Sequence, residues 1–417
     1  MHVAIVGGGL CGLALAIALK KRSIPFTIYE ARSSFTELGA GINLGPNTLE
    51  SFRLIDPALS EEVLKLCTRN PPPKEHLWMT VRLGGPTDKF RDAGVVAELN
   101  APPTGNATVR RNDLLQLLAD RAGPANAKFN KKLTDLRESA ENVELDFADE
   151  STETADVVIA CDGIHSAVRR KLLGADHPAA NPQYSETGVY RAILSTQDLE
   201  AAIGSSIAKT STIFVGPNAY IIMYPVELGS KVNIGFWVRR PGAWDERDWI
   251  LPSQRSQMEA DFAQCGDTVH KIMELIHDAD FWPTFCHVQQ PDTVASDRIC
   301  LIGDSAHSMP PHQGAGAGQA MEDAFVLAEV LGVASERSRD ALKAYEAVRT
   351  PRSQKVLQTS VEAMGFWSDF YRADLSEGDV KAFAREAQER FGWIWQDDIA
   401  GQARRAREMM EQNKSSL

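Results

Sequence analysis

The order of apolar and polar positions along the first thirty residues predicts a strand, a helix and a second strand. Residues 2–6 and 26–30 are short, largely apolar runs, and residues 10–21 form an apolar stretch of helical length between them. Two strands joined by a crossover helix lie parallel, because such connections are right-handed and return the chain to the same sheet. The chain therefore opens with a βαβ unit.

Further pieces of this kind follow far along the chain. We predict a short strand and helix within residues 109–122, strands at 143–147 and 156–161, and a strand and helix at 298–303 and 319–331. Stretches of different character separate these pieces. The α/β domain is therefore expected to be discontinuous.

Short β-rich segments joined by Gly, Pro and Asn turns predict a mainly antiparallel sheet inserted into the α/β domain. These segments are 188–194, 211–215, 219–225 and 231–238, with further strands expected in 77–99. From Asp340 onward the chain is charged and favours helices. We place the α/β domain at 1–75, 106–180 and 288–340, the sheet domain at 76–105 and 181–287, and a C-terminal helical region at 341–417.

Composition narrows the range of partners. The 417 residues carry a formal net charge of -12, which disfavours nucleic acid and anionic membrane surfaces, because both select basic proteins. The six cysteines show neither CxxC nor metal-ligand spacing, so we expect reduced thiols in the cytoplasm and no metal site. No apolar segment reaches the roughly 20 residues needed to cross a bilayer. We expect a monomer or homodimer that binds a small molecule.

A glycine-rich turn separates the first strand from the helix. The pattern G-x-G-x-x-G is formed by Gly7, Gly9 and Gly12, with Leu10 and Cys11 inside it. Glycine lets the backbone approach a pyrophosphate closely, and the helix N-terminus supplies free N–H groups. Glu30 ends the second strand, where a carboxylate would bond a ribose 2′-hydroxyl. An ordinary glycine turn beside a surface glutamate is the alternative, and the motif alone does not separate FAD from NAD.

Two later segments carry a resemblance to a known family. Residues 156–169 have the sequence DVVIACDGIHSAVR, and residues 298–319 have the sequence RICLIGDSAHSMPPHQGAGAGQ. With the first glycine turn they resemble, in the same order, the fingerprints of flavoprotein aromatic hydroxylases (group A flavoprotein monooxygenases), and of salicylate hydroxylases in particular. The resemblance covers roughly residues 1–350. Cys161 departs from it, because the family usually has a small residue such as alanine there.

The resemblance implies a Rossmann-like domain that binds FAD. Asp304 would accept hydrogen bonds from the ribitol chain, and the helix after the glycine turn would face the anionic reduced flavin. Asp162 would touch both FAD and the pyridine nucleotide, with a turn-capping aspartate as the alternative. The expected FAD contacts are Gly7, Gly9, Leu10, Cys11, Gly12, Glu30, Ala31, Arg32, Gly41, Arg111, Asp162, Gly163, Gly303, Asp304, Pro311, Gly314, Ala315, Gly316 and Ala317. Arg32 and Arg111 are also compatible with plain surface charges. His307 is compatible either with a hydrogen bond inside its own loop or with a role at the flavin or the substrate.

The resemblance also implies a reaction. NADH or NADPH would reduce FAD, O2 would then give a flavin C4a-hydroperoxide, and its distal oxygen would pass to an electron-rich aromatic ring. The sequence contains no second strand-turn-helix glycine motif, so the nicotinamide coenzyme is expected to bind transiently. The hydroperoxide decays if water reaches it, so the inserted sheet is expected to cover the site.

Candidate substrate residues lie in the β-rich region. Strand alternation places Tyr220, Ile222 and Tyr224 on one face. By resemblance, Tyr220 or Tyr224 would orient the hydroxyl group of the substrate, Arg191 would face the substrate side of the flavin, and Pro311 would lie in the loop beside it. Packing of both tyrosines within the sheet is the alternative.

The sequence thus predicts an FAD-dependent, NAD(P)H-consuming monooxygenase that hydroxylates a small phenolic, salicylate-like compound. Two alternatives stay open: the same chemistry on a heterocyclic or secondary-metabolite substrate, and a non-catalytic FAD-binding redox sensor or scaffold. Fold analogy alone does not choose the substrate.

Overall fold

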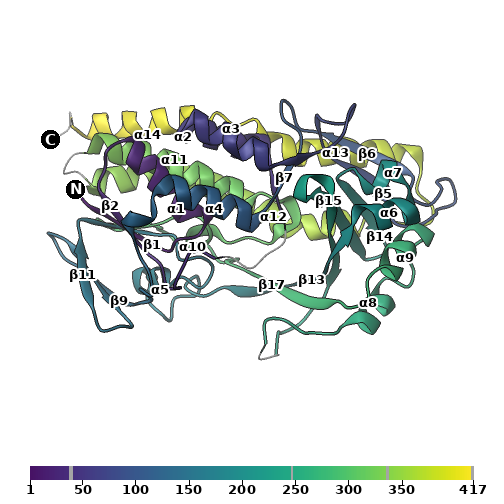
Figure 1. Cartoon of the computed structure of the whole chain (residues 1–417), viewed down its shortest axis with the longest axis horizontal. Coiled ribbons are helices and arrows are strands. Elements are labelled where there is room, and N and C mark those ends of the chain that lie inside the picture. The colour runs from purple at the N-terminus through teal and green to yellow at the C-terminus, as the bar shows by residue number, and fades with distance from the viewer. Residues whose placement is uncertain (37–40, 246–247, 335–337, 415–417) are drawn as a thin grey trace.

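The computed structural model describes residues 1–36, 41–245, 248–334 and 338–414. Two halves, each built on a sheet, lie side by side, and helices of the C-terminal third run along both in the view of Figure 1. Strands from the start of the chain lie in one half, and the teal strands of the middle of the chain lie in the other (Figure 1). The architecture is α/β, as the sequence predicts.

The first half is built on a parallel sheet. Its five strands lie in the order β18 (Ile299–Leu301), β12 (Val157–Ala160), β1 (Val3–Val6), β2 (Phe26–Tyr29) and β8 (Ala127–Lys128). β1 and β12 are buried along their whole length, which is typical of parallel strands covered on both faces. One face is covered by α1 (Leu10–Lys21), α4 (Arg111–Ala122) and α11 (Gly316–Ala334).

A small antiparallel sheet covers the other face of the parallel sheet. It contains β9 (Leu133–Glu138), β10 (Val143–Phe147) and β11 (Thr152–Ala155), and it packs there with α5 (Ala167–Leu173) and α10 (Asp304–His307). Residues 143–147 form a strand as predicted, but outside the parallel sheet. Buried and less buried residues alternate along β10, and this pattern is typical of an antiparallel strand with one solvated face.

The second half is built on a seven-stranded sheet. Its order is β17 (Asp280–Cys286), β13 (Gln183–Ser195), β16 (Lys231–Arg239), β15 (Ala219–Val226), β14 (Thr212–Gly216), β5 (Leu77–Leu83) and β6 (Val95–Asn100). Neighbouring strands are antiparallel except β14 and β5. Its outer face is covered by α6 (Thr196–Ile203), α7 (Ser205–Ala208), α8 (Arg255–Asp261) and α9 (Asp267–Glu274).

A second three-stranded sheet joins the two halves. It consists of β3 (Gly41–Leu44), β7 (Ala107–Arg110) and β4 (Thr68–Arg69), beside α2 (Pro46–Ile55) and α3 (Pro57–Leu66). The Thr108 hydroxyl on β7 donates to the Pro225 carbonyl oxygen on β15, which fixes this sheet to the larger one. Single-turn helices are η1 (Pro124–Asn126), η2 (Glu227–Gly229) and η3 (Pro311–Gln313).

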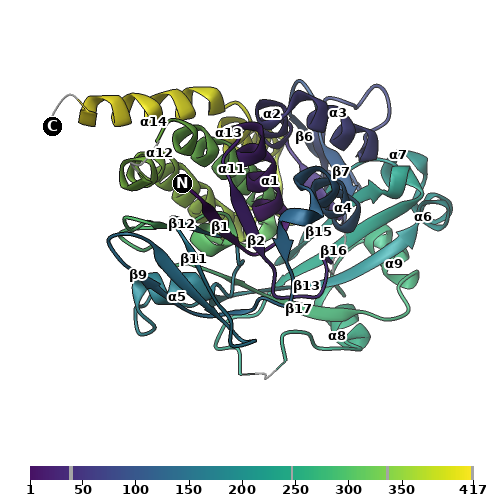
Figure 2. The ribbon, with the colours of Figure 1, turned by 60° about the vertical axis from the view of Figure 1, so that its left-hand side comes forward.

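The C-terminal helices are α12 (Ser338–Ser368), α13 (Glu377–Trp395) and α14 (Ile399–Lys414). α12 has 31 residues, or about 46 Å of helix, and contacts elements of both halves. Trp367 of α12 and Phe383 and Phe391 of α13 pack on the inner face of the seven-stranded sheet, so this region covers that sheet. α14 extends away from it (Figure 2). None of the described helices is long and apolar enough to span a membrane.

Candidate active site

A cavity of about 370 Å³ lies where the carboxyl ends of the parallel strands meet the inner face of the seven-stranded sheet. Ligands of open α/β sheets bind outside the carboxyl ends of the strands, so this is the expected place. The predicted site residues that line the cavity are Gly9, Leu10, Cys11, Gly41, Arg111, Gly163, Arg191, Tyr224, Asp304, Pro311, Gly314, Gly316 and Ala317. The structure therefore brings together segments that are almost 300 residues apart in the chain.

The glycine turn between β1 and α1 is closely packed on two sides and open on the third. Gly7 has a φ of +104°, and a Cβ atom there would lie 2.4 Å from the Cys161 carbonyl oxygen. A Cβ atom at Gly12 would lie 2.1 Å from the Gly7 carbonyl oxygen. At Gly9, the N-cap of α1, a Cβ atom would have no neighbour within 4 Å. This open helix N-terminus fits the pyrophosphate of a dinucleotide.

Glu30 lies beside the turn without lining the cavity. Its Oε2 accepts a hydrogen bond from the Gly8 N–H at 2.7 Å, and its Oε1 accepts one from the Arg32 N–H at 2.8 Å. Two backbone donors therefore orient the carboxylate. Ala31 and Arg32 are exposed, and the Arg32 guanidinium donates to the Thr36 carbonyl oxygen at 2.9 Å.

The segment after β18 presents a carboxylate and a helix N-terminus to the cavity. Gly303 has a φ of +60°, which turns the chain so that Asp304 is exposed toward the cavity. Asp304 makes no side-chain hydrogen bond or ion pair with any residue that the structure describes, so it is available to a hydroxylated ligand. Gly314, with a φ of +62°, precedes the 19-residue helix α11, whose first residues Gly316 and Ala317 line the cavity. Ala315 is buried behind them.

Asp162, within the segment 156–169, caps a helix next to the cavity wall. Its Oδ2 accepts hydrogen bonds from the N–H groups of Ala167 at 2.7 Å and Val168 at 3.2 Å, which caps α5. Burial raises the pKa of the Asp162 carboxyl, and Oδ1 has no hydrogen-bond partner in the described chain. The cavity wall itself is formed by the next residue, Gly163, which has a φ of +75°.

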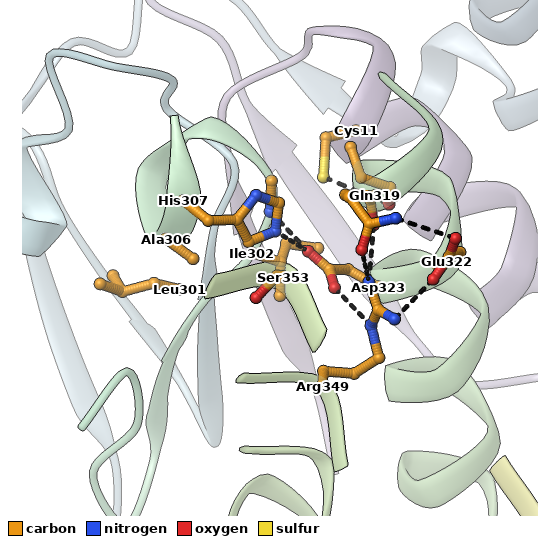
Figure 3. A network of polar contacts seen from close by, with 12 residues as sticks. Cys11, Leu301, Ile302, Ala306, His307, Gln319, Glu322, Asp323, Arg349 and Ser353 are labelled. Atoms are coloured by element: carbon orange, nitrogen blue, oxygen red, sulfur yellow. Dashed lines mark hydrogen bonds and ion pairs between the residues drawn. The ribbon is translucent and has the colours of Figure 1, made fainter. Parts of the chain in front are cut away.

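A buried charged network fixes α11 against the turn at Gly303 (Figure 3). The Asp323 carboxylate accepts hydrogen bonds from the Gly303 N–H at 2.9 Å, His307 Nε2 at 2.6 Å and Arg349 Nε at 2.8 Å. Burial alone would raise the pKa of Asp323, but His307 and Arg349 hold it well below its usual range. His307 thus binds a different helix instead of its own loop.

Asp323 and Arg349 were not predicted from the sequence as functional residues. A signal was present, because Glu322 and Asp323 interrupt the apolar helix predicted at 319–331, and adjacent carboxylates in a buried helix need buried cations. The pairing with Arg349 was not visible, since it depends on how α12 crosses α11. Arg349 also binds Glu322, at 2.6 Å.

The two candidate tyrosines lie on the same face of β15, together with Ile222, and both hydroxyl groups have protein partners. Tyr224 lines the cavity with its ring and donates to the Gly41 carbonyl oxygen at 2.7 Å. Tyr220 lies behind the cavity wall, with its hydroxyl 2.7 Å from His312 Nδ1. Burial lowers the pKa of His312 to about 3, so this imidazole is neutral. Burial also raises the pKa of both tyrosines.

Arg191 of β13 brings a positive charge to the cavity wall formed by the seven-stranded sheet. Its guanidinium lies 5.0 Å from the centroid of the Trp282 ring and makes no hydrogen bond or ion pair with a described residue. Arg191 is exposed at the cavity, and partial desolvation by the surrounding protein lowers the pKa of its guanidinium, so an anionic ligand would stabilise its charge. Three cavity residues on β16, Asn233, Gly235 and Trp237, were not predicted, although strand alternation within 231–238 places them on one face.

Comparison with known proteins gives consistent matches over the whole chain. Residues 1–360 match the family model described as FAD binding domain. The 6-methylsalicylate 1-monooxygenase of Aspergillus terreus (strain NIH 2624 / FGSC A1156) is 34% identical over 415 residues, 97% of this chain and 91% of its own length. The salicylate hydroxylase of Pseudomonas putida is 30% identical over 414 residues, which are 96% of this chain and 93% of that relative. A solved salicylate hydroxylase substrate complex aligns with a TM-score of 0.85 and 31% identity, covering 97% of this chain and 98% of that chain.

The chain therefore belongs to the FAD binding domain family. It is an FAD-dependent monooxygenase, because the family model describes an FAD binding domain and relatives named as monooxygenases match it along nearly their full length. The resemblance to aromatic hydroxylases and the predicted fold class are both confirmed. FAD is the cofactor that the open glycine turn, Asp304 and the N-terminus of α11 fit.

Proposed function

We propose that this monooxygenase uses NADH or NADPH and O2 to hydroxylate a small phenolic compound that carries a carboxylate, as salicylate does. The observation that carries the proposal is Arg191, a cation at the substrate side of the cavity without a protein anion beside it among the described residues. Two relatives named for salicylate or 6-methylsalicylate chemistry support the same substrate class. Arg191 would pair with the carboxylate and so fix which ring carbon faces the flavin.

The chain would supply the surroundings of the reaction. The chemistry that FAD would supply when bound is acceptance of two electrons from the nicotinamide coenzyme and activation of O2 for transfer of one oxygen atom. Gly9 and the N-terminus of α1 would hold the pyrophosphate, and Asp304 would accept hydrogen bonds from ribitol hydroxyls. The N-terminus of α11 would stabilise negative charge on the reduced cofactor, by roughly 0.3–2 kcal/mol from the helix dipole.

Exclusion of water would come from the sheet and the helices behind it. Ile222, Tyr224 and Trp237 form an apolar wall on the substrate side of the cavity. Behind this wall, Trp367 and Phe391 close the gap between the sheet and α13. A dry wall favours transfer of oxygen to the substrate over release of hydrogen peroxide.

The test is oxidation of NADH and NADPH by the purified FAD-loaded protein with phenols, hydroxybenzoates and heterocycles, together with peroxide detection and product mass. We expect a hydroxybenzoate to speed coenzyme oxidation and to gain one oxygen atom with little peroxide. If a heterocycle is the only compound whose hydroxylation is coupled to coenzyme oxidation, the substrate is a heterocycle and not a hydroxybenzoate. Absence of coenzyme oxidation with every compound would favour a non-catalytic FAD-binding protein.

A further inference from the structure

One face of β16 turns three residues toward the substrate side of the cavity. Asn233, Gly235 and Trp237 alternate along this strand and all line the cavity. In the sheet register, Gly235 lies between Arg191 on β13 and Ile222 on β15. A patch of bare backbone at Gly235 is therefore bordered by a guanidinium, an amide and an indole.

Two polar atoms on this face have no partner in the protein. The indole Nε1 of Trp237 and the side-chain Oδ1 of Asn233 are buried without a hydrogen bond to any described residue. Their side chains belong to residues that are only 5% and 7% exposed. A buried donor or acceptor without a partner destabilises the protein, and both residues line the cavity. A ligand with the complementary groups would satisfy both.

The orientation of Trp237 is fixed by the residues behind it. The Tyr220 ring is parallel to the indole within 10°, with centroids 6.0 Å apart. The His312 ring meets it edge-on at 4.9 Å, and His312 is bonded to the Tyr220 hydroxyl at 2.7 Å. Tyr220 therefore acts on the cavity through Trp237, as a positioning residue.

Gly235 keeps the surroundings of the indole N–H free of a further side chain. Its φ is not in the left-handed region, so the backbone does not require glycine at this position. A Cβ atom at Gly235 would lie 3.1 Å from Trp237 Nε1 and 3.1 Å from a methyl carbon of Val189. Any side chain would therefore crowd the donor, and glycine leaves room there for a ligand atom.

We propose that Asn233 and Trp237 select, together with Arg191, an aromatic substrate in which a hydroxyl group lies next to a carboxylate. Trp237 Nε1–H and Arg191 hold the carboxylate, and Asn233 Oδ1 accepts the hydrogen bond of the hydroxyl group. This inference rests on the proposed function and adds to it the residues that read the hydroxyl. Neutral Asn233 can serve as an acceptor at any pH at which the protein is folded.

The test compares three ligands on the FAD-loaded protein: 2-hydroxybenzoate, benzoate and phenol. Dissociation constants come from the change in flavin absorbance without coenzyme. We expect Asn233→Leu to raise the dissociation constant of 2-hydroxybenzoate about tenfold. The dissociation constant of benzoate should stay unchanged, because benzoate lacks the hydroxyl group. We expect Trp237→Phe to raise the dissociation constants of 2-hydroxybenzoate and benzoate about tenfold and to leave that of phenol unchanged.

Two further variants separate recognition from folding. Gly235→Ala retains the indole and crowds its N–H, so it should reproduce the ligand pattern of Trp237→Phe. Trp244→Phe is the matched control, because the Trp244 N–H is also buried without a described partner but does not line the cavity. It should change none of the three constants. FAD content and Tm show whether each variant folds.

The outcomes distinguish the two proposals. If the wild-type protein binds and hydroxylates 2-hydroxybenzoate, but the Asn233 and Trp237 variants weaken all three ligands equally or none of them, the inference is wrong and the proposed function stands. If the wild-type protein binds no carboxylated aromatic, the proposed function is wrong and the inference falls with it.

Discussion

The wall of the cavity that faces the start of α1 and the wall formed by β13, β15 and β16 are built from different parts of the polypeptide. The first, the cofactor wall, consists largely of backbone at Gly9, Gly163, Gly314 and Gly316. The second, the substrate wall, consists mainly of side chains, among them Arg191 and Trp237. A backbone wall tolerates few substitutions, because any Cβ atom changes it. A side-chain wall can change its ligand while the strands stay in place.

The largest effect is expected behind the cofactor wall, in the network around Asp323. Arg349→Met would leave Glu322 and Asp323 buried without the cation that they share, and breaking a buried pair typically costs about 3–5 kcal/mol of folding free energy. Urea unfolding followed by circular dichroism measures this loss. Arg339→Met is the control, since Arg339 is exposed on the same helix and should change stability little. Equal stability of the two variants would contradict a structural role for the network.

The same network predicts how stability depends on pH. The pKa values of Glu322 and Asp323 lie below 4.5 and 3.8, the usual values of these groups, because Arg349 and its neighbours outweigh the effect of burial. In the acidic range the unfolded chain binds more protons than the folded one, so their contribution is present above about pH 5 and is lost as the pH falls. We expect Tm to fall from pH 5 to pH 3, with a shallower slope in Asp323→Asn. Identical slopes would remove Asp323 as a cause.

On the cofactor wall itself, Gly12→Ala should abolish stable FAD binding and cost about 1–3 kcal/mol of stability. The reason is that its Cβ atom would meet a backbone oxygen at 2.1 Å, which cannot move without shifting β1. Gly9→Ala sharpens the comparison, since its Cβ atom has open space within the protein. That variant should keep the Tm of the apoprotein and lose FAD affinity. The ratio of flavin to protein absorbance and the apoprotein Tm measure both. Similar apoprotein Tm values for the two variants would argue against this account.

On the substrate wall, Arg191→Gln should weaken the binding of a hydroxybenzoate about 10- to 100-fold, since hydrogen bonds to charged groups contribute roughly 1.5–3 kcal/mol. FAD content and Tm should stay close to those of the wild type. Arg239→Gln is the control, because Arg239 lies on β16 and pairs with Asp369 outside the cavity. Titration of the flavin absorbance with ligand gives the constants. Loss of FAD from the Arg191→Gln variant would indicate that Arg191 supports binding of the cofactor instead of the substrate.

The smallest effect is expected where the two walls meet. Tyr224→Phe removes the hydrogen bond to the Gly41 carbonyl oxygen and should cost about 1 kcal/mol of stability, with FAD still bound. Coenzyme oxidation with a coupled substrate would then stay stimulated. A complete loss of product in this variant would instead assign the hydroxyl to the substrate, as the sequence-based hypothesis has it.

The elements of the cofactor wall could be predicted because short segments define them. The helix expected at residues 10–21 is α1, and the glycine turns on either side of the cavity follow local patterns. The substrate wall depends on register between strands that are far apart, so the sequence did not reveal that Trp237 would stand in front of Tyr220. The pairing of Asp323 with Arg349 likewise needs the packing of two helices. Such contacts have no periodic signature along the chain.

The strand order of the parallel sheet has a consequence for biosynthesis. β1 pairs with β12, which in turn pairs with the edge strand β18, so the sheet lacks this edge strand until residues 299–301 have left the ribosome. At typical rates of translation this is about 15–60 s after β1 emerges. The turn after β18 also carries Asp304, so a nascent chain lacks this part of the cavity, which we propose to bind FAD, until late in its synthesis. We therefore expect FAD to bind only after most of the chain has been made, and a chain released early would expose β12 as an open sheet edge.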